Sequence, residues 1–140
     1  AGPKRPQDRI ELKAAGAKRA LLLAVSAPFH STLMQPAAEA LRERLAEVAF
    51  AAPRFALVNN VDVAVQSDPD AIRDALYRQA FGPVRWVEVV QALRRRGLSH
   101  VVECGPGKVL AGMVKRIDAT AVTMTIFDPA TLVEAKELLA

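Results

Sequence analysis

The chain has 140 residues, of which 51% are hydrophobic and 24% charged, a composition typical of one soluble globular domain or a large piece of one. Its only cysteine, Cys104, excludes an internal disulfide and a thiolate-rich zinc site. No apolar run reaches the ~20 residues of a membrane span, and no charged-then-apolar secretory pattern opens the sequence. We therefore expect a cytoplasmic protein that neither spans nor binds a membrane.

The net charge of +4 is concentrated at one end of the sequence. Residues 1–19 carry six basic and two acidic side chains, whereas residues 20–140 carry 13 of each. Many nucleic-acid-binding surfaces interleave aromatic and basic residues. The few aromatic residues of this chain do not alternate with basic ones. We therefore expect no nucleic acid among the partners.

Short apolar runs alternate with amphipathic helices in the first half of the chain. A helix over about 9–15 ends at Gly16 and precedes a buried strand at 20–25. Apolar residues at three- and four-residue steps predict a helix over 33–48, and a second short strand follows at 55–59. A capping side chain and a first-turn proline at 67–70 predict a helix that runs to about Ala80 and stops at Gly82–Pro83.

The second half continues the same alternation. A helix over about 84–96 ends at Gly97, after three arginines that suit its negative C-terminal end. Strands at 100–104 and 121–127 are each followed by a helix, the first ending near Ile117 and the second running over Pro129–Leu139. Helices separated by short apolar strands predict an α/β fold with a parallel sheet covered on both faces. Residues 1–8 are expected to form a loosely attached basic arm.

Three loops lie where open α/β sheets place their reactive groups, beyond the carboxyl ends of strands. They are SAPFHS (26–31), NNVD (59–62) and ECGPGK (103–108). His30 lies in the first loop, and a catalytic role and a local hydrogen-bonding role are equally open for it. His100 opens a strand and is expected to be a partly exposed structural histidine.

The third loop resembles a phosphate-binding loop only superficially. Val109 follows Lys108, where a Walker loop needs Ser or Thr, so a tight strand-to-helix turn is favoured over an anion site. Cys104 is expected to be a small buried thiol. Glu103 and Asp62 are the best-placed carboxylates, but nothing in their spacing makes them an acid–base pair.

None of the four serines stands in the G-x-S-x-G pattern of a hydrolase nucleophile, so His30 lacks a nucleophilic partner within the chain. A metal site is not expected either.

Four segments together resemble the C-terminal half of bacterial malonyl-CoA:acyl carrier protein transacylases. They are VSAPFHSTLMQPAAEAL (Val25–Leu41), NNVDV (Asn59–Val63), RQAFGPVRWVEVV (Arg78–Val90) and ECGPGKVLAGMVKRI (Glu103–Ile117). The resemblance runs from about Ala14 to about Ile117 and keeps the order of the family's motifs. It implies the α/β-hydrolase-like core of the acyltransferase, with residues 9–25 as the last helix and strand of a ferredoxin-like subdomain and residues 26–140 as the C-terminal portion of the large subdomain.

The resemblance also implies roles for three residues. His30 matches the catalytic histidine of a Ser–His pair that moves malonyl from coenzyme A to acyl carrier protein through a serine ester, in fatty acid biosynthesis. Gln79 matches the residue whose main-chain carbonyl orients that histidine, so a backbone shift at Gly82–Pro83 is expected to be harmful. Phe29 matches a position where a bulky ring goes with malonyl over methylmalonyl, although simple loop packing remains open. No cofactor is implied beyond the substrates malonyl-CoA and phosphopantetheinylated acyl carrier protein.

The family's nucleophilic serine, carboxylate-binding arginine and oxyanion-hole glutamine have no match in this chain, because they belong to the N-terminal half. We therefore expect the isolated 140-residue chain to be inactive. The alternative is a non-catalytic fragment that binds acyl carrier protein through Arg94–Arg96 and Lys115–Arg116, although these residues also suit a solvated helix end. An unrelated α/β hydrolase is a third and weaker alternative.

Overall fold

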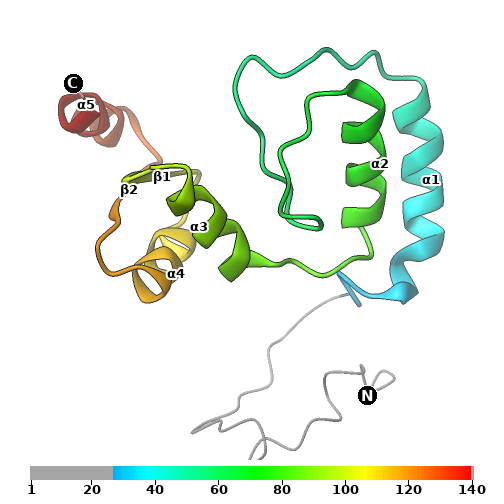
Figure 1. The fold of residues 1–140 in the computed structure, drawn as a ribbon, viewed down its shortest axis with the longest axis horizontal. Coiled ribbons are helices and arrows are strands. Elements are labelled where there is room, and N and C mark those ends of the chain that lie inside the picture. Colours follow the sequence, from blue (N-terminus) through cyan, green and yellow to red (C-terminus); the bar gives the residue numbers. More distant parts are fainter. Residues whose placement is uncertain (1–26, 140) are drawn as a thin grey trace, which may run out of the picture. The chain divides into compact units, whose positions relative to one another are not determined.

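The structure, a computed structural model, describes residues 27–139, which form two compact units (Figure 1). Among the described residues, the first unit consists of 27–54 and 67–84, and the second of 55–66 and 85–139. The predicted helix at 9–15, the strand at 20–25 and the boundaries at residues 9 and 26 lie outside the described residues. No helix within 27–139 is long and apolar enough to cross a bilayer.

The first unit is built on two helices that pack side by side. A short 3-10 helix, η2 (Thr32–Met34), leads into α1 (Gln35–Ala46), and α2 (Pro69–Gln79) packs against α1. Small and branched side chains are buried in this unit: Ala38, Ile72 and Ala75. The predicted helix over 33–48 is therefore confirmed, although its α-helical turns begin two residues later and end two residues earlier.

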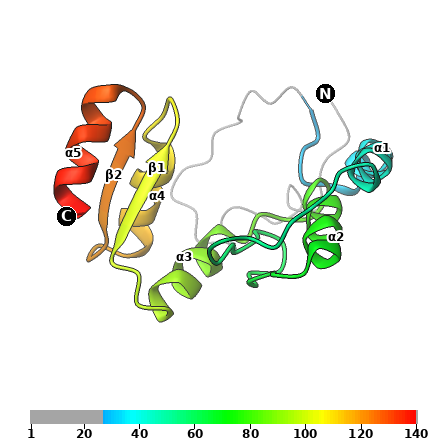
Figure 2. The same cartoon turned by 90° about the horizontal axis from the view of Figure 1, so that it is seen from above.

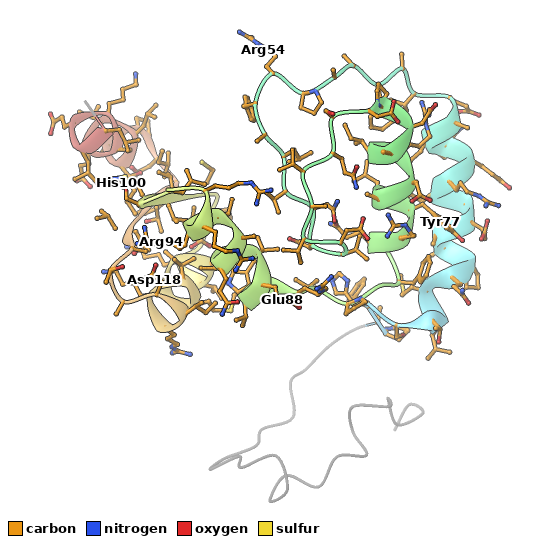
Figure 3. All side chains as sticks on the ribbon, viewed as in Figure 1. Arg54, Tyr77, Glu88, Arg94, His100 and Asp118 are labelled. Atoms are coloured by element: carbon orange, nitrogen blue, oxygen red, sulfur yellow. The ribbon has the colours of Figure 1, made fainter. Side chains whose placement is uncertain are left out.

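Polar contacts also join the two helices of the first unit. The Tyr77 hydroxyl on α2 donates a 2.5 Å hydrogen bond to the Glu39 carboxylate on α1, which raises the pKa of Tyr77 (Figure 3). The Arg42 guanidinium lies 5.2 Å from the centroid of the Tyr77 ring. The start of α2 is fixed by Asp68, whose side chain accepts a 2.8 Å hydrogen bond from the backbone N–H of Ala71. This confirms the predicted capping signal.

The second unit contains a parallel pair of strands between helices. Its elements are α3 (Trp86–Arg95), β1 (His100–Cys104), α4 (Val109–Ile117), β2 (Val122–Ile126) and α5 (Pro129–Leu139). His100 pairs with Val122 at one end of the sheet and Cys104 with Ile126 at the other. Figure 1 shows α5 on one face of the sheet and α3 and α4 on the other, and Figure 2 shows the two strands side by side. The predicted parallel α/β arrangement is confirmed.

The apolar core of this unit lies between α3, α4 and the sheet. Val90, Val114 and Ala121 are buried there, and the partly buried side chains around them are Trp86, Val101 and Ile117. Removing such side chains from water is the main favourable term in folding.

One predicted strand is wrong. Residues 55–59 form no strand: Val58 makes an isolated antiparallel bridge with Val65, and the Leu57 carbonyl accepts a hydrogen bond from Gln66. Phe55 is 80% exposed, so the apolar run is not buried among the described residues. A short apolar run predicts a buried segment, but the segment forms a β-strand only where a neighbouring strand pairs with it.

Candidate active-site histidine and the other motif loops

His30 lies in a strained turn immediately before η2. Its backbone φ is 56°, in the left-handed region that costs an L-residue roughly 1–2 kcal/mol. Such a conformation persists only where the surroundings enforce it, and it is frequent at functional sites. The Ser31 hydroxyl donates a 2.7 Å hydrogen bond to the Pro28 carbonyl, and the Ser31 carbonyl accepts one of 2.9 Å from Met34. The turn is therefore held from both sides.

The imidazole of His30 contacts a segment far away in the sequence. Its Nδ1 lies 3.2 Å from the Gly82 carbonyl oxygen, just beyond the end of α2. A carbonyl only accepts hydrogen bonds, so Nδ1 carries the proton and donates it. In the neutral ring Nε2 is then unprotonated, which is the state a general base requires.

Gln79, the residue expected to orient His30, is the last residue of α2. The hydrogen-bond partner established for Nδ1 is the carbonyl of Gly82, three residues further on, and the role of Gln79 stays a prediction. Sequence reasoning singled out Gly82–Pro83 as the end of the helix and as a sensitive backbone segment, but not as the acceptor. The Gly82 N–H bonds back to the Arg78 carbonyl at 2.8 Å, which closes this helix end.

Phe29, the expected substrate-adjacent residue, precedes His30 in the same turn. Phe29 is 51% exposed, so contacts within the described residues cover only about half of its surface. A specificity role for Phe29 stays a prediction.

The NNVD loop belongs to the second unit and is braced by Arg85. The Asn59 side chain accepts a 2.7 Å hydrogen bond from the Asp62 N–H, and Val63 adopts a φ of 59°, which is unfavourable for a β-branched residue. Arg85 donates from its backbone to the Asn60 carbonyl (3.1 Å) and from its guanidinium to the Asp62 carbonyl (3.4 Å). These contacts use main-chain atoms of the loop, so they give it a fixed shape.

Arg85 also forms an ion pair with Glu88 in the first turn of α3, and this hydrogen-bonded contact lowers the pKa of Glu88. The same side chain therefore links the start of α3 to the NNVD loop.

The ECGPGK turn connects β1 to α4 and is closed by its own carboxylate. Glu103 Oε2 accepts a 2.9 Å hydrogen bond from the Ala111 N–H in the first turn of α4. Gly105 has a φ of 143°, which a side chain would disfavour, and its N–H bonds to the Ile126 carbonyl at 2.9 Å. This supports the tight-turn interpretation over an anion site, because the carboxylate takes one of the N–H groups that an anion would use.

The surroundings of Cys104 correct one expectation. Cys104 is exposed and not buried, because it is the last residue of β1, where the strand leaves the cover of the helices. His100 is exposed as expected, and its Nδ1 lies 2.8 Å from the Ser99 hydroxyl. A shallow pocket of about 120 Å³ lies beside this turn, lined by Pro106, Gly107, Lys108 and Phe127. Among residues 27–139 no group of histidine, cysteine and acidic side chains could hold a metal ion.

The chain is similar in sequence to known transacylases. The sequence is 49% identical to the malonyl CoA-acyl carrier protein transacylase of Escherichia coli (strain K12) over 126 residues, which is 90% of this chain and 41% of that protein. The corresponding protein of Salmonella typhimurium is 51% identical over 120 residues. The chain resembles malonyl CoA-acyl carrier protein transacylases. No family model matches the sequence.

Solved structures of malonyltransferases are also similar to this chain. The acyl-carrier-protein S-malonyltransferase of Burkholderia pseudomallei 1710b superimposes with a TM-score of 0.83 at 63% identity, over 89% of this chain and 41% of that one. A malonyl-transacylase solved in complex with a type II polyketide acyl carrier protein gives a TM-score of 0.85 at 48% identity, over 90% and 41%. The resemblance to the transacylases seen in four motifs is therefore confirmed. The chain spans about two fifths of the length of the curated relatives it matches.

Proposed function

We propose that this chain supplies the general base of a malonyl transferase, which moves malonyl from coenzyme A to the phosphopantetheine thiol of acyl carrier protein. The observation that carries the proposal is the arrangement of His30, whose left-handed turn accompanies a contact between Nδ1 and the Gly82 carbonyl, which favours the neutral tautomer with its proton on Nδ1. The sequence identity to malonyl transacylases supports malonyl as the transferred group.

His30 carries out successive proton transfers in two half-reactions. In the first half-reaction Nε2 accepts the proton of a serine hydroxyl as the serine oxygen attacks the thioester carbonyl of malonyl-CoA. The tetrahedral intermediate collapses, the C–S bond breaks, and Nε2 returns the proton to the departing coenzyme A thiolate. In the second half-reaction Nε2 takes the proton of the carrier's thiol, the thiolate attacks the serine ester, and the serine oxygen leaves with that proton.

The thiol chemistry makes modest demands on the base. A thiol has an ordinary pKa near ~8.5, so its thiolate leaves without strong protonation. A histidine oriented by a main-chain carbonyl is sufficient for this step, and no aspartate is needed to strengthen it.

The nucleophile has to come from outside this chain, because none of its serines stands in an elbow motif. We expect the isolated 140-residue chain to transfer no malonyl, since catalytic residues that act as a unit lose most of their effect when one is missing. Measurable transfer by the verified 140-residue polypeptide would contradict this mechanism.

A chimera tests the function directly. The segment of the Escherichia coli enzyme that matches this chain is replaced by the matching residues of this chain, and malonyl transfer to acyl carrier protein is measured. Transfer at a rate within tenfold of the parent enzyme supports the proposal, and a folded chimera without a malonyl-serine ester contradicts it. Mass spectrometry after incubation with malonyl-CoA detects the ester.

A second candidate is a carrier-binding role without catalysis. Of the basic residues at the C-terminal ends of α3 and α4, Arg94 is engaged within the chain and Arg96 bonds to the Ala92 carbonyl at 3.3 Å. Arg95, Lys115 and Arg116 are exposed, and they suit an acidic carrier. Carrier binding by a chimera that forms no serine ester would favour this second candidate.

A further inference from the structure

Ser31 follows His30 in the sequence, but its hydroxyl donates to the Pro28 carbonyl and not to the imidazole. Its Oγ donates a 2.7 Å hydrogen bond to the carbonyl of Pro28, so the bond closes a turn around His30. We propose that Ser31 is a positioning residue, which holds His30 in the conformation that its proton transfers require. The proposal rests on the proposed function for its kinetic effect, but not for its effect on the imidazole ring.

The backbone of His30 explains why such a residue is needed. A left-handed φ of 56° is unfavourable for a residue with a Cβ atom, so the turn relaxes unless neighbouring contacts oppose it. Ser31 is bonded in both directions, through its side chain to Pro28 and through its carbonyl to the Met34 N–H at the start of the helix.

The ring contact depends on that backbone conformation. Nδ1 of His30 reaches the carbonyl of Gly82, 52 residues further along the chain, at 3.2 Å. A change of φ at His30 rotates its Cα–Cβ bond and moves Nδ1 away from that carbonyl. The neutral ring then loses the bond that keeps its proton on Nδ1, and Nε2 is no longer reliably unprotonated. Ser31 thus acts on the reaction through His30.

The same geometry argues against Ser31 as a nucleophile. A serine nucleophile donates its proton to the base, whereas the proton of Ser31 points to a carbonyl that cannot take it up. Substitution of Ser31 therefore tests the orientation of His30 and does not remove an acyl acceptor.

The two histidines of the chain provide a matched control. Each is adjacent to a serine whose side chain is hydrogen-bonded: Ser31 to the turn before His30, and Ser99 to Nδ1 of His100. Ser31 has φ −136° and ψ 164°, extended geometry that a β-branched threonine also adopts. The informative set is therefore Ser31→Ala, Ser31→Thr and Ser99→Ala.

The first measurement is ¹⁵N NMR of the imidazole nitrogens in the 140-residue chain, where only two rings contribute. We expect His30 to hold its proton on Nδ1 in the unsubstituted chain and in Ser31→Thr, and to lose that preference in Ser31→Ala. Ser99→Ala should change only the His100 signals. An unchanged His30 tautomer in Ser31→Ala overturns the proposal.

The second measurement is steady-state malonyl transfer by the chimera. Ser31→Ala should lower kcat about three- to tenfold, the worth of one hydrogen bond, with KM for malonyl-CoA unchanged and activity restored in Ser31→Thr. A loss no larger than that of Ser99→Ala overturns the proposal. If the unsubstituted chimera forms no ester, the proposed function fails, and the tautomer measurement alone decides the role of Ser31.

Discussion

Arg94 in the last turn of α3 and Asp118 just after α4 form an ion pair that joins the ends of the two helices (Figure 3). Arg94 also donates to the Leu98 carbonyl at 2.5 Å and to the Thr120 hydroxyl at 3.2 Å. Asp118 accepts hydrogen bonds from the backbone (2.9 Å) and hydroxyl (2.6 Å) of Thr120. One cluster therefore fixes the segments that lead into β1 and β2.

This cluster makes stability depend on pH. The hydrogen bonds from Thr120, followed by the charge of Arg94, lower the pKa of Asp118 in the folded chain. A carboxylate with a lowered folded pKa stabilises the fold above its unfolded pKa of about 3.9, and this contribution is lost as pH falls through the lower folded value. We expect the urea concentration at the unfolding midpoint to decrease as the pH is lowered below about 4.

Asp118→Asn isolates this contribution. The variant should be less stable than the unsubstituted chain at pH 7. It should also lose less stability than the unsubstituted chain when the pH is lowered from about 4 to about 2. The matched control is Glu134→Gln, an exposed residue of α5. Equal acid sensitivity in the unsubstituted chain and Asp118→Asn would assign the effect to other carboxylates.

Arg73 stabilises the first unit by capping the end of α1. Its guanidinium donates to the carbonyls of Leu45 (3.0 Å) and Val48 (3.3 Å) and lies 5.1 Å from the centroid of the Phe50 ring. Arg73→Ala should lower the free energy of unfolding by about 1–2 kcal/mol, because two carbonyls lose a donor. Urea denaturation followed by circular dichroism measures it. A variant as stable as the unsubstituted chain would show that water replaces the guanidinium without cost.

His30→Ala should cut the rate of serine acylation in the chimera by roughly 10²–10⁴, the usual worth of a positioned general base. Single-turnover labelling with malonyl-CoA measures the rate. His100→Ala, at the exposed start of β1, is the control and should leave acylation within twofold. An acylation rate unchanged in His30→Ala would reduce this residue to a structural role.

The end of α2 should be sensitive in its backbone and tolerant in its side chains. Gln79→Ala should leave kcat within about threefold, because Gln79 is expected to act through its main-chain carbonyl, which the substitution keeps. Insertion of one glycine between Phe81 and Gly82 should abolish transfer, since it displaces Gly82–Pro83 from the end of α2 and with it the carbonyl that lies 3.2 Å from Nδ1. Activity assays on both chimeras, with circular dichroism to confirm folding, measure this. Retained activity in the insertion variant would contradict the orienting role of this segment.

Much of the second unit follows from local sequence signals. The strand at 100–104 and the helix at 129–139 have their predicted bounds, because an apolar run between polar turns and a first-turn proline act over a few residues. The strand predicted at 55–59 was wrong, because strand formation there depends on tertiary neighbours that the local sequence does not specify. Cys104 misled it because the end of a strand is less covered than its middle.

The candidate site shows the same division. The motif around His30 predicts a catalytic histidine, but the identity of the carbonyl that faces Nδ1 depends on the position of a segment 52 residues away. No sequence signal predicted the left-handed φ of His30, which occurs in a turn where Ser31 bonds to Pro28 and Met34.

The carboxylate of Glu103 has a practical consequence for motif searches. A scan that accepts any glycine-rich turn between a strand and a helix returns GPGK as a nucleotide-binding false positive. The acidic residue at the end of the preceding strand distinguishes it, because this side chain already bonds to the first turn of α4 at 2.9 Å. A filter that rejects turns with Glu two residues before the first glycine would remove this match.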